Sequence, residues 1–69
     1  MKKTLLIEGM MCMHCEARVK KILEALDGVE SAEVSHKSGT AIVTLKFDIR
    51  DNEFKKIIED QGYTLVSIK

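Results

Sequence analysis

Residues 9–15 of the chain read Gly9-Met10-Met11-Cys12-Met13-His14-Cys15, and the spacing of apolar residues changes at this stretch. The residues before it, 3–8, are β-prone and alternate between two faces, which predicts a strand. After it, four apolar residues recur at the helical spacing i, i+3, i+4 and i+7, namely Val19, Ile22, Leu23 and Leu26. The stretch is therefore expected to be a surface loop that leads from a strand into the N-terminus of a helix.

Periodicity also predicts the elements that follow this helix. Asp27-Gly28 is expected to end it, because glycine commonly occupies the left-handed position after a helix. The later elements are, in order, a strand at 29–36, a hairpin partner at 40–47 with Ala41, Val43, Leu45 and Phe47 on one face, a helix that follows candidate N-caps at 48–52 and ends at Gln61-Gly62, and a strand at 63–68.

The element order is β-α-β-β-α-β, which is that of the ferredoxin-like α+β fold. In this open-faced sandwich, two helices cover one face of an antiparallel four-stranded sheet. We expect the first and third strands to be central and parallel, joined through the first helix. A right-handed crossover places the loop before the first helix and the loop after the second helix at the same end. Tyr63 is therefore predicted to lie beside Cys12 and Cys15.

Length and composition limit the classes of function. Residues 1–69 are expected to form a single domain, too small for a buried multi-step active site, and no catalytic constellation is present, so we do not expect an enzyme. Eleven basic and eleven acidic residues cancel, and the only aromatic residues are one tyrosine and two phenylalanines, which disfavours nucleic-acid binding. No apolar run has the length of a membrane span or of a signal-peptide core. We therefore expect no membrane insertion and a cytoplasmic location.

The chemistry of the loop is that of its two cysteines, Cys12 and Cys15. In a reducing cytosol they are expected to be thiols, and a bridge between them would close too short a loop to add much stability. Two thiolates at this spacing can bind one ion, and their softness favours Cu(I), which accepts two sulfur ligands. A closed zinc site needs four ligands, and only His14 and His36 could join the cysteines. The helix N-terminus alone lowers a thiol pKa by roughly 0.2 to 0.7.

Three segments together resemble one known family. Gly9–Cys15, the helix end Leu26-Asp27-Gly28-Val29 and the segment Gln61-Gly62-Tyr63 are similar to the heavy-metal-associated domain, whose pattern is G-M-x-C-x-x-C with a downstream G-V and a terminal G-Y or G-F. The match spans essentially the whole chain and is nearest to the bacterial copper chaperones of that family. A lone C-x-x-C would be weak, but the flanking features at these spacings make the resemblance specific.

The resemblance implies roles for the residues of the loop. It implies that Cys12 and Cys15 bind the metal and that Met10 packs under the loop as a hydrophobic tether. Tyr63 matches the position where bacterial chaperones often have a tyrosine, close enough to influence the site through its hydroxyl.

Three loop residues keep open roles. His14 also recurs in bacterial copper chaperones, and it is either solvated, tunes the loop or joins a shared site in a dimer. Met11 departs from the family pattern, which most often has threonine or serine there. Met11 and Met13 are either surface residues or a weak additional contact to the metal.

The function implied is that of a Cu(I) chaperone, which carries one ion and passes it to a partner by thiolate exchange. The implied partner is the metal-binding domain of a copper-exporting P-type ATPase, and a metal-bridged homodimer is also considered. Arg18, Lys20 and Lys21 lie one turn past the site. They are either a solvated helix face or a docking surface for an acidic partner domain.

Alternatives remain open at this point. The chain could be the N-terminal metal-binding domain of a heavy-metal P-type ATPase, although its start at Met1 and its end just after the last strand favour a complete small protein. It could instead be selective for Hg(II) or Zn(II). A different class is a dithiol-disulfide oxidoreductase, but thioredoxin-type motifs usually have proline between the cysteines.

Overall fold

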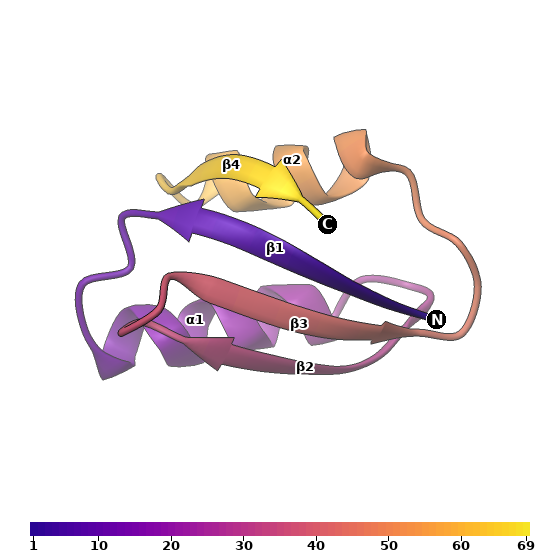
Figure 1. Ribbon diagram of the computed structural model, residues 1–69, viewed down its shortest axis with the longest axis horizontal. Coiled ribbons are helices and arrows are strands. Elements are labelled where there is room, and N and C mark those ends of the chain that lie inside the picture. The colour runs from indigo at the N-terminus through magenta and orange to yellow at the C-terminus, as the bar shows by residue number, and fades with distance from the viewer.

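The computed structural model describes all residues from 1 to 69, and its element order is the predicted one. Four strands form one sheet, and both helices lie on the same face of it (Figure 1). Neither helix is long and apolar enough to cross a membrane. The elements are β1 (Lys2–Glu8), α1 (Met13–Glu24), β2 (Val29–Ser35), β3 (Thr40–Leu45), α2 (Asp51–Asp60) and β4 (Thr64–Ile68).

The strand order in the sheet is β2-β3-β1-β4, so β1 and β3 are central as predicted. The prediction that these two strands are parallel is wrong, because Lys2 pairs with Thr44 and Leu6 pairs with Thr40 in antiparallel register. The reason is the β2–β3 hairpin, which reverses the chain and inserts β3 between β1 and β2. The parallel strands are therefore β1 and β2, which α1 connects across the intervening strand.

The core lies between the sheet and the helices. Alternation places the buried side chains of each strand on one face, as predicted for Leu5 and Ile7 in β1. Burial of each large apolar side chain contributes about 1.5–3 kcal/mol relative to exposure. The largest fully buried side chains come from both layers: Phe54, Leu5, Leu23, Ile58, Val19 and Val43.

The buried alternation of β3 stops earlier than predicted. The strand ends at Leu45, and the backbone N–H of the next residue, Lys46, donates to the carbonyl of Gly28, the residue before β2, at 2.7 Å. Phe47 was expected on the same face as Leu45 but is 52% exposed. Its ring lies over Gly28, where an added Cβ would be 2.7 Å from ring carbons. Ile49, 6% exposed, enters the core instead.

Two helix ends also differ from prediction. Helix α1 ends at Glu24, and the chain turns through three more residues to Gly28, whose φ of +99° is left-handed. Helix α2 begins at Asp51 after Arg50, and no side chain caps it, so the polar residues 48–52 do not supply the expected N-cap bond. The chain does turn at Gly28, where glycine adopts the left-handed φ that the turn requires, but the helix has already ended at Glu24.

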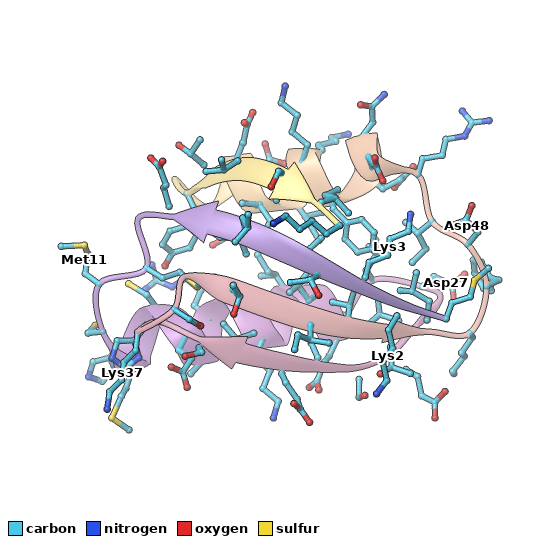
Figure 2. The ribbon with its side chains drawn as sticks, viewed as in Figure 1. Lys2, Lys3, Met11, Asp27, Lys37 and Asp48 are labelled. Atoms are coloured by element: carbon cyan, nitrogen blue, oxygen red, sulfur yellow. The ribbon has the colours of Figure 1, made fainter.

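Lys3 links β1 to the connection between β3 and α2. Its Nζ donates to the Ile49 carbonyl at 3.0 Å and lies 3.3 Å from carboxylate oxygens of both Asp48 and Asp51. Partial desolvation lowers the pKa of Lys3, but the two carboxylates outweigh it and hold the pKa above its usual value. This cluster lies at the end of the molecule opposite Met11 (Figure 2). The cluster therefore links β1 to the β3–α2 connection at the end of the domain remote from the cysteine loop.

Candidate metal centre

The two cysteines flank the start of α1. Cys12 is the N-cap residue with an extended backbone, φ −159° and ψ 178°, and Cys15 lies in the first turn. The N–H of Glu16 donates to the Cys12 carbonyl at 3.1 Å, which closes this turn. Cys12 is exposed, Cys15 is half-buried, and both are free thiols. The start of α1 therefore brings both sulfurs to one end of the domain.

The Cys15 thiol has a pKa below its ordinary value. Its pKa falls from 9.0 to about 7, first because the Tyr63 hydroxyl acts as a hydrogen-bond donor to the sulfur, then because the Met11 backbone N–H does so. Partial desolvation opposes this, and the Cys12 thiol and backbone N–H add to it. The fall is larger than the roughly 0.2 to 0.7 that a helix N-terminus supplies. Cys15 therefore loses its proton more readily than an unperturbed thiol does.

Tyr63 lies beside the loop, where the topology predicted it. The residue is 7% exposed, and a Cβ added at Gly9 would be 3.3 Å from its Cδ1 atom. The neighbouring Cys15 sulfur is the first cause that raises the pKa of the Tyr63 hydroxyl, followed by burial. Because the hydroxyl stays protonated at neutral pH, it remains a donor to the thiolate.

The methionines of the loop separate by burial. Met10 is 6% exposed and belongs to the core, whereas Met11 and Met13 are 83% and 73% exposed. The Met11 side chain points away from the ribbon into solvent (Figure 2). His14 is also exposed. The structure therefore gathers Cys12, Cys15 and Tyr63, places Met10 in the core, and leaves Met11, Met13 and His14 exposed around the site.

Periodicity missed a polar contact next to the site. Glu16 Oε2 lies 2.6 Å from His36 Nδ1 and accepts the backbone N–H of His36 at 2.9 Å. His36 was interpreted only as a residue at the end of a strand. The topology could have indicated this contact. A helix that connects two parallel strands begins at the end of the sheet where the second strand finishes, so its first turn lies near the residues that follow that strand.

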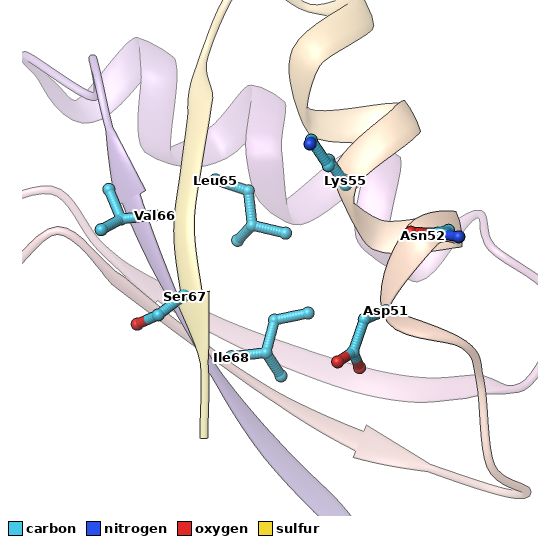
Figure 3. Close-up of a pocket in the computed structure, with 7 residues that line it drawn as sticks. All are labelled: Asp51, Asn52, Lys55, Leu65, Val66, Ser67 and Ile68. Atoms are coloured by element: carbon cyan, nitrogen blue, oxygen red, sulfur yellow. The ribbon is translucent and has the colours of Figure 1, made fainter.

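The hollows of the surface do not contain the cysteines. One lies between β4 and α2, and Leu65 and Ile68 point into it from the strand (Figure 3). The other lies between α1 and β2, and Met13 is one of the residues that line it. No group of three or more His, Cys, Asp or Glu side chains comes together in the structure, whereas a closed zinc site takes four ligands. The donor set of the loop is a pair of thiols.

A ferredoxin-like domain with an exposed cysteine pair at the start of its first helix defines a class of small metal-binding modules. A model of one such family, the heavy-metal-associated domain, matches residues 4–64. The chain belongs to the heavy-metal-associated domain family.

Named relatives are similar over nearly the whole chain. A copper chaperone CopZ of Staphylococcus aureus (strain bovine RF122 / ET3-1) is 41% identical over 63 residues, which cover 87% of this chain and 90% of that protein. The solved structure of a CopZ metallochaperone superposes with a TM-score of 0.86 at 38% identity and covers 96% of this chain and 100% of its own. A copper binding domain from HMA7, a P-type ATPase, superposes with a TM-score of 0.83 at 27% identity. This match covers 100% of this chain and 99% of that one.

Proposed function

We propose that this chain is a Cu(I) chaperone that binds one Cu(I) between the thiolates of Cys12 and Cys15. The observation that carries this assignment is the pair of free thiols at the start of α1, with Cys12 exposed, Cys15 half-buried and the Cys15 pKa lowered to about 7. Two thiolates suit the low coordination number of Cu(I). The similarity to copper chaperones supports the same metal. Hg(II), which also accepts two thiolates, and Zn(II) are the competitors in the test below.

Release follows from the same exposure. A thiolate of the partner approaches the ion from the solvent side, next to the exposed Cys12 sulfur, and forms a third copper–sulfur bond. One of the two resident copper–sulfur bonds then breaks, and the freed thiolate takes up a proton from solvent. No electron is transferred, because copper enters and leaves as Cu(I). The ion is therefore held firmly yet exchanged without the chain unfolding.

The proposed partner is the metal-binding domain of a copper-exporting P-type ATPase. The copper binding domain from HMA7, a P-type ATPase, has the same fold as this chain, which supports docking between two domains of this kind. Arg18, Lys20 and Lys21 are exposed on α1 and form the proposed docking rim for an acidic partner surface. A homodimer in which two loops share copper is the second proposed assembly.

The remaining parts of the proposal concern the whole chain. We propose that residues 1–69 form one heavy-metal-associated domain that acts in the cytoplasm and carries metal without catalysing a reaction. The relatives named copper chaperone and metallochaperone support the part of this proposal that concerns carrying metal. The measurement that addresses catalysis is disulfide-reducing turnover, which we expect to be absent.

A Cu(I) titration against a colorimetric chelator tests the proposal. We expect one Cu(I) per wild-type chain, and loss of binding in both Cys12→Ser and Cys15→Ser. Competition with Hg(II) and Zn(II) in the same assay establishes the metal preference. Wild-type affinity in both serine variants would refute the assignment of the ligands.

A further inference from the structure

Of the apolar residues in the first turn of α1, only Cys15 packs against the core, and it is half-buried. Cys12 caps α1 without a side-chain hydrogen bond. Met13, His14 and Ala17 are all exposed, and the first fully buried residue of the helix is Val19. The first turn of a helix has unpaired backbone N–H groups, so a turn with little packing opens easily. A polar contact that fixes this turn therefore adds to the limited apolar packing that Cys15 provides.

The Glu16 carboxylate supplies that contact. One of its oxygens, Oε2, accepts the His36 backbone N–H at 2.9 Å and lies 2.6 Å from His36 Nδ1. Both side chains are partly shielded from solvent, at 34% and 22% exposed. Both contacts come from one residue and end on one carboxylate oxygen, which fixes that oxygen beside the end of β2. Hydrogen bonds to an ionised acceptor are among the stronger ones in proteins.

A second glutamate makes a comparable contact at the other end of α1. Glu24 Oε2 accepts the backbone N–H of Ala32 at 3.2 Å. Both glutamates thus bind backbone N–H groups of β2 or of the residue that directly follows it, and β2 is an edge strand. The helix is tied to the same strand at its metal end and at its distal end. Because the two contacts are of the same kind, Glu24 is a matched control for Glu16.

We propose that Glu16 is a positioning residue of the metal site, which holds the first turn of α1 against His36 so that the Cys15 sulfur stays beside Cys12 and the Tyr63 hydroxyl. The proposal rests on the assignment of Cys12 and Cys15 as the copper ligands. Glu16 itself does not touch the ion. Its effect is to remove motions of the turn that would separate the two sulfurs before copper arrives.

Two alanine variants of α1 test this role. Glu16→Ala and Glu24→Ala each remove one tie to β2, and the urea midpoint of each shows that it is folded. We expect Glu16→Ala to lower the Cu(I) affinity about tenfold, which is typical when a residue that orients a metal ligand is lost. Glu24→Ala should change it by less than about twofold. Amide hydrogen exchange at Glu16 and Ala17 should accelerate only in Glu16→Ala.

Conservative variants keep the test decisive if Glu16→Ala unfolds. Glu16→Gln retains an acceptor oxygen and should recover part of the affinity, and His36→Ala retains the backbone bond and should lose less than Glu16→Ala. Wild-type affinity in Glu16→Ala, or equal losses in Glu16→Ala and Glu24→Ala, would overturn the positioning role. Wild-type affinity in Cys12→Ser and Cys15→Ser would instead overturn the ligand assignment, so the two failures are distinguishable.

Discussion

The hydroxyl of Tyr63 acts on the sulfur of Cys15 from the opposite end of the sequence. As a hydrogen-bond donor it is the largest cause of the fall in the Cys15 pKa to about 7. The ring of the same residue packs against Gly9, where an added Cβ would be 3.3 Å from Cδ1. One side chain therefore supports the backbone at the start of the loop and stabilises a thiolate at its end.

Removal of the hydroxyl alone should make Cys15 less acidic. In Tyr63→Phe the ring keeps its contact with Gly9, while the donor to the thiolate is lost. We expect the pKa of Cys15 to rise from about 7 towards 9.0. The pH dependence of alkylation at Cys15, followed by mass spectrometry of each cysteine, measures this change. An unchanged pKa would mean that the backbone N–H groups of the loop suffice.

The same pKa makes the stability of the metal-free protein depend on pH. Since the folded pKa of Cys15, about 7, lies below its ordinary 9.0, folding favours the thiolate. This contribution is fully present above pH 9 and is lost as the pH falls through 7. We therefore expect the Tm to rise between these two pH values in the wild type. Cys15→Ser should remove the rise, and an equal rise in that variant would contradict the attribution.

The neighbourhood of the cysteines could be predicted because it depends on topology. The order of elements and the handedness of the crossover were enough to bring Tyr63 to the loop before Cys15. Apolar periodicity also identified the core of α1, where Val19 and Leu23 are buried. These features need no side-chain geometry.

One wrong prediction could have been avoided from the sequence, and two other features needed the three-dimensional structure. The predicted β2–β3 hairpin already makes β3 antiparallel to β2, and therefore also to β1, which is parallel to β2. Phe47 continued the alternation of β3 in sequence, but the strand ends at Leu45 and the Phe47 ring lies over Gly28. The contact of Glu16 with His36 depends on the angle of the helix over the sheet. Such contacts follow from packing, not from spacing.

Two glycines separate backbone strain from the contact with Tyr63. Gly9 and Gly62 both have left-handed φ values, +102° and +89°, but only a Cβ at Gly9 would meet another atom within 4 Å. A side chain at such φ costs about 1–2 kcal/mol. We expect Gly62→Ala to lose about that much stability in urea unfolding, and Gly9→Ala to lose more. Equal losses would show that the Tyr63 ring moves aside at no cost.

Copper binding should offset a defect in the core. Phe54 is fully buried in α2, and Phe54→Ala should cost about 3–5 kcal/mol. A chain of this size has about 3–10 kcal/mol of stability, so the metal-free variant is expected to be partly or largely unfolded. Because Cu(I) binds the folded state, its addition should restore helical circular dichroism. No recovery at saturating Cu(I) would indicate that the unfolded chain binds the ion as well as the folded one.

Two adjacent methionines should differ in how much stability the same substitution costs. Met11 is 83% exposed and points into solvent, while Met10 is 6% exposed in the core. We expect Met11→Thr to change the free energy of unfolding by less than about 0.5 kcal/mol, which corresponds to about a twofold effect on an equilibrium constant. Met10→Thr should cost about 2 kcal/mol or more, because it leaves a cavity and buries a hydroxyl.

The Cu(I) titration then decides whether the exposed thioether is a ligand. If Met11 only covers the loop, Met11→Thr keeps the wild-type affinity within about twofold, because no copper–sulfur bond is lost. A third sulfur ligand would instead make the variant lose at least about tenfold, the loss seen even for residues that only orient a ligand. The same titration at falling pH should weaken binding in both proteins, since protons compete with copper for the Cys12 and Cys15 sulfurs.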